Sequence, residues 1–143
     1  MSALRIVIDT NVVFAGLRSR RGASHLILEE IGQSQAFRIH LSVPLVLEYE
    51  EIAKRNSRAL GLSHSDIDDL LDYLCSVAGL HDIYYLWRPY LKDPDDDMLL
   101  ELAVMAECQR IVTFNERDFH GIEQFGIRAI SPQEFLSEIG AIR

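Results

Sequence analysis

The chain contains little cysteine and no long apolar run. Its two cysteines, Cys75 and Cys108, are too few and too far apart for a disulfide framework or a zinc knuckle. Both lie in apolar helical patterns, which is typical of buried thiols in a reducing compartment. No stretch approaches the length of a membrane span, and the N-terminus reaches Asp9 too soon for a signal peptide. We therefore expect a cytoplasmic protein with no membrane association.

Basic residues are outnumbered by acidic ones. The 143 residues include 14 Lys and Arg against 22 Asp and Glu, which gives a formal net charge of −8. This balance disfavours broad, non-specific binding of nucleic acid, but it allows a local basic patch or a metal-bridged contact with phosphate. Hydrophobic residues make up 48% of the chain and charged residues 25%, which excludes disordered and fibrous proteins. The length predicts one domain over residues 1–143.

Apolar β-branched runs alternate with helical patterns along the chain. Strands are predicted at residues 4–8, 37–41, 82–86, 110–114 and 128–130, and helices at 23–35, 45–58, 66–78, 94–107 and directly after Ser131. This alternation predicts an α/β fold with a mainly parallel sheet flanked by helices. Because ligands bind beyond the carboxyl ends of such strands, candidate functional residues should lie there.

Carboxylates follow or begin several of these predicted elements. Asp9 comes directly after the first strand, Glu48 lies at the border of a helical apolar stripe, Asp97 emerges beside a buried helix, and Asp118 follows the fourth strand. Each has an ordinary structural explanation. Asp9 could cap a helix, Glu48 could be a solvated side chain, Asp97 could stabilise a helix N-terminus, and Asp118 could be a turn residue.

Together, however, the four acids come from four different elements, and at least three could converge at one end of the sheet. Carboxylate oxygens suit a hard cation such as Mg²⁺ or Mn²⁺. Ions held by an acid cluster can activate water and neutralise phosphate in phosphodiester hydrolysis. Other polar residues at the same strand ends could support the site, namely Thr10, Asn11, Thr113 and Asn115.

Four segments resemble the PIN-domain ribonucleases, especially the toxin components of bacterial toxin–antitoxin pairs. They match in order and spacing and cover nearly the whole chain: residues 6–12 (IVIDTNV), 42–49 (SVPLVLEY), 93–103 (DPDDDMLLELA) and 111–119 (IVTFNERDF). The resemblance implies a single PIN-like domain with a four- or five-stranded parallel sheet between helices. It also implies an RNA substrate, an antitoxin partner and often a homodimer.

The resemblance also implies roles for individual residues. Asp9, Glu48 and Asp97 match the metal-binding acids of the family, and Asp96 is the alternative to Asp97 because the helix start is uncertain by a residue. The residues that match a polar pair helping to order the site are Thr113 and Asn115. Many relatives have Asp at the position of Asn115, so Asp118 is the candidate fourth acid.

Basic side chains are concentrated in two places that could contact RNA phosphates. The candidates are Arg18, Arg20 and Arg21 in one cluster and Lys54 and Arg55 in the other. A solvated loop and helix face explain these clusters at least as well.

The leading hypothesis is a metal-dependent endoribonuclease that acts as a toxin. A phosphatase of the haloacid-dehalogenase type also has Asp after its first strand, but it needs a second Asp two residues later, where this chain has Asn11. The remaining alternative is a catalytically weak or inactive α/β module that binds RNA or a protein.

Overall fold

The computed structural model describes residues 3–83 and 90–142. One five-stranded parallel sheet forms from β1 (Leu4–Ile8), β2 (Phe37–Ser42), β3 (Gly79–His81), β4 (Arg110–Val112) and β5 (Arg128–Ile130). The α-helices are α1 (Thr10–Arg18), α2 (Ala23–Glu30), α3 (Val43–Arg55), α4 (Ser57–Leu60), α5 (His64–Val77), α6 (Pro94–Met105) and α7 (Pro132–Glu138). Two short 3-10 helices, η1 (Glu116–Phe119) and η2 (Ile122–Phe125), lie between β4 and β5. The predicted α/β class with a parallel, helix-flanked sheet is confirmed.

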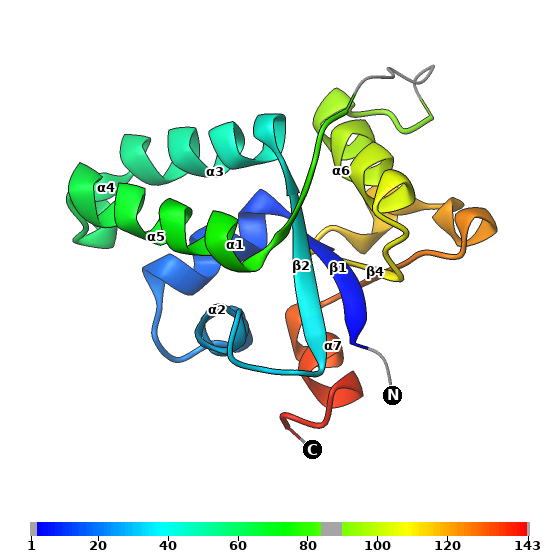
Figure 1. The fold of residues 1–143 in the computed structure, drawn as a ribbon, viewed down its shortest axis with the longest axis horizontal. Coiled ribbons are helices and arrows are strands. Elements are labelled where there is room, and N and C mark those ends of the chain that lie inside the picture. Colours follow the sequence, from blue (N-terminus) through cyan, green and yellow to red (C-terminus); the bar gives the residue numbers. More distant parts are fainter. Residues whose placement is uncertain (1–2, 84–89, 143) are drawn as a thin grey trace.

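Helices cover the sheet from both sides. In Figure 1, α6 lies on one side of β1 and β2, and α1, α2, α3 and α5 lie on the other. Helix α6 contacts β1, β2 and β4, whereas α3 and α5 contact β2 and each other. This arrangement buries both faces of the central strands, which explains why β1 reads as a nearly continuous apolar run.

The order of the strands across the sheet is β3-β2-β1-β4-β5, which places the switch point of the sheet between β1 and β4. The chain first builds outward from β1 through β2 to β3, and then returns to place β4 on the other side of β1. The crevice beyond the carboxyl ends of two such strands is the usual ligand site of a parallel sheet. Asp9 directly follows β1 and Thr113 directly follows β4, so both predicted site residues lie at this switch point.

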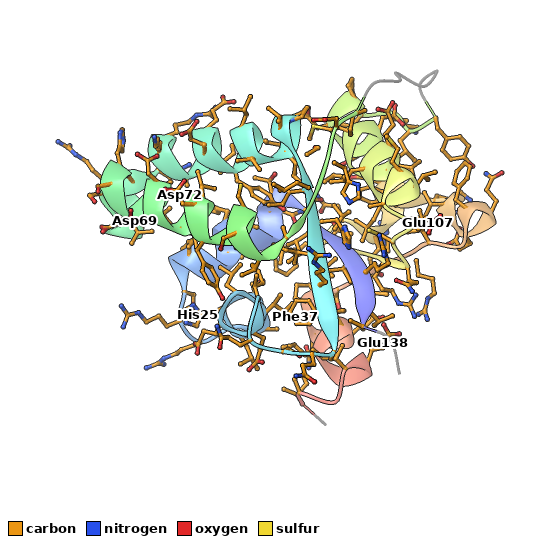
Figure 2. The ribbon with its side chains drawn as sticks, in the orientation of Figure 1. His25, Phe37, Asp69, Asp72, Glu107 and Glu138 are labelled. Carbon is orange, nitrogen blue, oxygen red and sulfur yellow. The ribbon has the colours of Figure 1, made fainter. Side chains whose placement is uncertain are left out.

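The core consists of aliphatic side chains from the strands and from the inner faces of the helices. Ile6 and Val7 in β1 and Leu100 in α6 are fully buried. At the other end of the sheet, Phe37 packs edge-on against Phe135 of α7, with ring centroids 5.1 Å apart. Figure 2 places Phe37 inside the molecule, while the side chains of α5 extend into solvent on its outer face.

Several predicted helix starts have the expected capping contacts. The Ser63 hydroxyl accepts a hydrogen bond from the Asp66 N–H at 3.0 Å, and the Asp66 carboxylate accepts one from the Ser63 N–H at 2.9 Å. Ser131 caps α7 in a similar way through the N–H of Glu134. The start of α7 directly after Ser131 is therefore confirmed, whereas α5 begins at His64, two residues before the predicted start at residue 66.

The predicted third strand, residues 82–86, is wrong in its described part. Strand β3 lies earlier, at Gly79–His81, and residues 84–86 lie outside the described residues. Gly79, the first residue of β3, pairs with His40 in β2. A Cβ atom on Gly79 would lie 2.4 Å from Nδ1 of His40, so glycine is required here for the His40 ring to pack across the strand.

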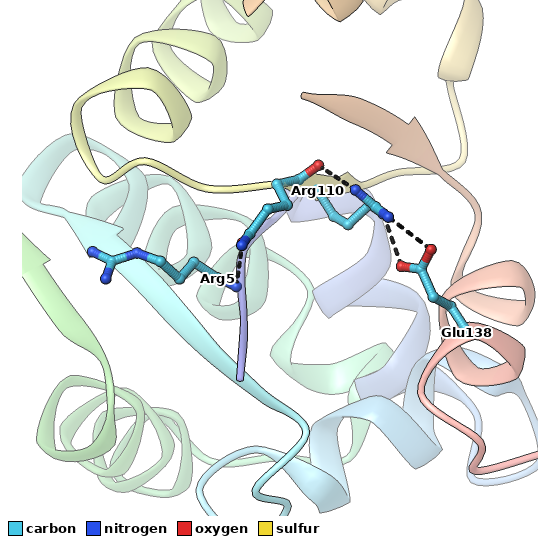
Figure 3. A network of polar contacts seen from close by, with 4 residues as sticks. Arg5, Arg110 and Glu138 are labelled. Carbon is cyan, nitrogen blue, oxygen red and sulfur yellow. Dashed lines mark hydrogen bonds and ion pairs between the residues drawn. The ribbon is translucent and has the colours of Figure 1, made fainter. Parts of the chain in front are cut away.

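A polar network at the amino ends of β1 and β4 holds the C-terminal helix in place. The Arg110 guanidinium donates two hydrogen bonds to the Glu138 carboxylate, each 2.8 Å long, as Figure 3 shows. Arg110 also donates to the carbonyl of Gln109, whose side chain accepts a bond from the Arg5 N–H at 2.7 Å. These contacts link α7 to the sheet at the end opposite to the candidate site.

Both cysteines are free thiols; Cys108 is buried as predicted, whereas Cys75 is only half-buried. Over residues 3–83 and 90–142, no helix has the length and hydropathy needed to cross a membrane.

Candidate active site

Asp9 is held at the centre of the switch point by both neighbouring strands. Its N–H donates to the Val112 carbonyl at 2.9 Å, which extends the β1–β4 pairing by one residue. Its Oδ2 accepts a hydrogen bond from the Thr113 hydroxyl at 2.8 Å, and only 8% of its surface is exposed. Asp9 occupies the N-cap position of α1, but its side chain makes no capping hydrogen bond. The backbone N–H groups of Thr10 and Asn11 nevertheless lower the pKa of this carboxylate, and the bond from Thr113 adds a contact that helix capping does not require.

Glu48 reaches the same region from α3. Its Oε1 accepts a hydrogen bond of 2.6 Å from the hydroxyl of Thr10, the first residue of α1. Thr10 is only 6% exposed, and Glu48 is half-buried. Thr10 thus orients the carboxylate of Glu48, and Thr113 orients that of Asp9. The two predicted supporting residues therefore each have a defined contact in the site.

The start of α6 brings Asp96 to the site and directs Asp97 elsewhere. Asp93 is the N-cap and accepts a bond from the Asp95 N–H at 2.9 Å. Oδ1 of Asp97 accepts the N–H groups of Leu91 at 2.8 Å and Tyr90 at 3.2 Å, so this carboxylate fixes the segment that leads into the helix. One residue corresponds to about 100° of rotation around a helix, which separates the two neighbouring side chains.

Electrostatics place Asp96 with the other acids. Burial raises the pKa of Asp96 to about 7, and repulsion from Asp9, Asp93, Asp118 and Asp95 contributes to the shift. Of the two aspartates that the sequence offered for the third acid, the structure brings Asp96, the alternative, into the acid group. Asp97, the first choice, instead binds the backbone of residues 90 and 91.

Asp9 and Glu48 also have raised pKa values. Burial is the main cause for both carboxyls, and the hydrogen bonds from Thr113 and Thr10 respectively oppose the shift. The charge of Asp118 adds to the raised pKa of Asp9, and the charges of Asp95 and then Asp9 add to the raised pKa of Glu48. These are the signs of carboxylates crowded into one partly dry region.

Asp118 enters the group from η1, directly after the end of β4. The Asn115 N–H donates to the Thr113 hydroxyl at 3.0 Å, and the Asp118 N–H donates to the Asn115 carbonyl at 3.0 Å. Asp118 is exposed, as expected of a loop residue, yet its charge acts on both Asp9 and Asp96. The acid group therefore consists of Asp9, Glu48, Asp96 and Asp118.

The donor atoms of the acid group suit a hard divalent cation. All are carboxylate oxygens, and the neighbouring Oδ1 of Asn11 is buried and has no hydrogen-bond partner within the described part of the chain. Among those same residues, no three His, Cys, Asp or Glu side chains are arranged so that they could hold a metal ion together. An ion would therefore have to draw these carboxylates closer to one another than they lie here.

A cleft of about 560 Å³ opens beside the acid group. It is lined by three acids, by three basic side chains that were not predicted from the sequence, and by Tyr90 and Leu91. The full lining is Tyr90, Leu91, Lys92, Asp93, Asp96, Arg117, Asp118 and His120. Arg117 and Lys92 place positive charge next to the carboxylates. A signal was available in the sequence, because Arg117 lies within the segment of residues 111–119 and Lys92 directly precedes the acidic run.

The predicted RNA contacts lie away from this cleft. Lys54 pairs with Glu50 at 3.0 Å and Asp68 at 2.7 Å, and Arg55 pairs with Glu51. Arg18 ends α1, and both α1 and α3 run away from α6 in Figure 1. The basic residues that follow, Arg20 and Arg21, are exposed and are not among the described residues that line this cleft.

Comparison with known proteins agrees with this geometry. A family model described as PIN domain matches residues 5–117. A solved structure, VapBC2 from Rickettsia felis bound to a DNA fragment from their promoter, is similar in fold. It has a TM-score of 0.57 and 13% sequence identity, and the alignment covers 88% of this chain and 97% of that one. No curated protein matches the sequence. The family match extends from β1 to η1 and includes every member of the acid group except Asp118, and the chain belongs to the PIN-domain family.

Proposed function

We propose that the protein is a metal-dependent endoribonuclease that hydrolyses RNA phosphodiester bonds. The observation that carries the proposal is the acid group, in which carboxylates from four elements crowd around the switch point of the sheet. Two of them are oriented by threonine hydroxyls, and the PIN-domain family match supports a nuclease.

The acid group is suited to Mg²⁺ or Mn²⁺, which would supply an activated water and neutralise charge on the phosphate. Asp9, Glu48 and Asp96 would hold the ion, and Asp118 would add charge from the loop. Thr113 and Thr10 keep the carboxylates of Asp9 and Glu48 in place. Asp97 acts as a positioning residue, because it ties the segment before α6 to the helix start.

Lys92 and Arg117 are the proposed phosphate contacts. Both line the cleft with Asp96 and Asp118, so a phosphate near the acids would lie within reach of positive charge. The chain as a whole carries −8, and these two side chains offset that repulsion locally.

The proposed cellular role is that of a toxin neutralised by an antitoxin protein. This role rests on the resemblance of residues 6–12 and 111–119 to toxin components, and on the fold likeness to VapBC2. Expression of the protein alone should arrest bacterial growth, and co-expression of the product of a short neighbouring reading frame should relieve the arrest.

Cleavage of a labelled single-stranded RNA by the purified protein tests the activity. We expect cleavage with Mn²⁺ or Mg²⁺ that EDTA abolishes, and no cleavage by Asp9→Asn. Asp69→Asn is the matched control, because Asp69 is an exposed aspartate on α5 that lies at the opposite end of the molecule from α6 in Figure 2. RNA binding without cleavage by the wild-type protein would instead support the alternative, an inactive binding module.

A further inference from the structure

Phe114 is a large apolar side chain left in solvent at the edge of the candidate site. It is 53% exposed, although it lies between Thr113, which is fully buried, and Asn115. The exposed part of the ring does not contribute to the hydrophobic core and is available to contact a ligand.

The backbone on both sides of Phe114 is fixed. The Thr113 N–H donates to the Ile130 carbonyl at 2.9 Å, and the Asn115 N–H donates to the Thr113 hydroxyl at 3.0 Å. That same hydroxyl donates to Asp9. The aromatic ring is therefore carried on the same rigid strand end that orients the central acid.

Phe114 lines a second hollow, of about 290 Å³, which adjoins the cleft. Its other walls are Asn115, Glu116, Arg117 and Asp118, and it shares the last two with the cleft. A ligand whose phosphate lies beside Arg117 and the acids could extend past this shared wall and reach Phe114.

We propose that Phe114 stacks against an unpaired base of the RNA whose phosphate lies in the adjoining cleft. This inference rests on the proposed ribonuclease function. Aromatic side chains bind the faces of unstacked bases, and a base inside a duplex has no free face to offer. The amide of Asn115 and the carboxylate of Glu116 lie in the same hollow and can bond the polar edge of a base.

A protein partner fits this hollow less well. Among the described residues, every wall other than Phe114 is polar, so within that part of the chain Phe114 has no apolar neighbours in this hollow of the kind that form the core of a protein interface. Three aliphatic side chains are also strongly exposed, but they line a separate groove between α3 and β3; they are Val43, Leu47 and Leu80.

The test uses a short unstructured RNA carrying 2-aminopurine, whose fluorescence is quenched by stacking. Binding is measured with EDTA present, and cleavage is measured with Mn²⁺. Phe114→Ala should weaken RNA binding and raise KM about tenfold or more, with a smaller change in kcat, and should abolish the quenching that wild-type protein causes at one base. Phe114→Trp should restore all three. The control is Leu80→Ala, which removes an equally exposed apolar side chain from β3 and should behave as wild type.

The inference is overturned if Phe114→Ala binds, quenches and cleaves like the wild-type protein, or if wild-type protein cleaves a fully paired duplex as fast as the single strand. The proposed function fails separately, and this inference with it, if wild-type protein does not cleave RNA in Mn²⁺ at all. Because both side chains are exposed, Phe114→Ala and Leu80→Ala should melt at the same temperature as the wild type. Unchanged melting temperatures exclude misfolding as the cause of a loss of binding or cleavage.

Discussion

The Thr113 hydroxyl donates a 2.8 Å hydrogen bond to Oδ2 of Asp9, and in doing so it joins the ends of β4 and β1. The two residues are separated by more than a hundred positions in the sequence, yet they meet because β1 and β4 are parallel neighbours in register. This bond favours the charged form of a carboxylate that burial pushes toward the neutral form. Thr113 thus keeps the central acid available as a ligand.

Thr113→Val should raise the pKa of Asp9 further, because it removes a donor to the ionised carboxylate. The acidic limb of the pH–rate profile should move to higher pH. The variant should also lose about 1–3 kcal/mol of stability, since a buried acceptor is left without a partner. Thr113→Ser keeps the hydroxyl and should retain the wild-type profile. An unshifted profile for Thr113→Val would show that Asp9 does not limit the rate.

Asp96 and Asp97 provide a matched pair of substitutions. Asp96→Asn should lower cleavage about a hundredfold or more, because it removes a negative charge from the acid group. Asp97→Asn keeps an oxygen that can accept from the N–H groups of Leu91 and Tyr90, so it should retain activity within about tenfold of wild type. Metal-dependence curves for both variants on one RNA provide the measurement. The reverse order of effects would return the third ligand position to Asp97.

The stability of the metal-free protein should fall as pH rises through the range of Asp96. The pKa of Asp96 is raised from 3.8 to about 7, so the folded protein binds this proton more tightly than the unfolded chain does. Its contribution is therefore complete below pH 4 and is lost as pH approaches 7. Denaturant unfolding in EDTA at pH 5 and pH 8 measures it, and added Mn²⁺ should restore stability at pH 8.

His40 acts in the opposite direction over an overlapping range. Burial lowers its pKa from 6.5 to about 4, so its contribution is present above pH 6.5 and is lost as pH falls toward 4. Subtracting the stability of Asp96→Asn from that of the wild type at each pH cancels the contribution of His40, because both proteins contain His40. A difference that does not change with pH would contradict the raised pKa of Asp96.

The sequence predicted the elements that depend on local patterns. The β-branched run ending at Ile8 located β1, and the Ser-Pro-Gln-Glu signal located α7, because capping and strand propensity act between near neighbours. It therefore placed Asp9 correctly at a strand end. Helix α6 begins at the predicted residue 94, so the choice between Asp96 and Asp97 depended instead on which face of α6 meets the sheet. The packing of α6 on β1, β2 and β4 sets that face, and a step of one residue rotates a side chain out of the site.

Features set by distant contacts could not be read from the sequence. Lys54 was a candidate RNA contact, but it pairs with Asp68 of α5, a partner that only the packing of α3 on α5 provides. Strand β3 was misplaced because the requirement for Gly79 comes from the ring of His40 on the neighbouring strand. The cleft residues Tyr90 and His120 come from segments flanking α6 and η1, and only the fold brings them together.

The contact between Arg110 and Glu138 offers a test of stability that leaves the site untouched. The two side chains form an ion pair with two hydrogen bonds; Glu138 is 28% exposed and Arg110 is 17% exposed. Glu138→Gln should weaken this pair and lower the free energy of unfolding by about 0.5–1.5 kcal/mol. Because the pair lies at the amino ends of the strands, cleavage of RNA below the unfolding temperature should be unchanged. Urea unfolding and the cleavage assay measure the two effects on one sample.

Glu134→Gln, on the same helix at the exposed cap, is the control and should change stability less, because its side chain makes only a 3.4 Å contact with Ser131. A loss of activity in fully folded Glu138→Gln would mean that α7 influences the acid group through the sheet, and that the two ends of the sheet do not act independently.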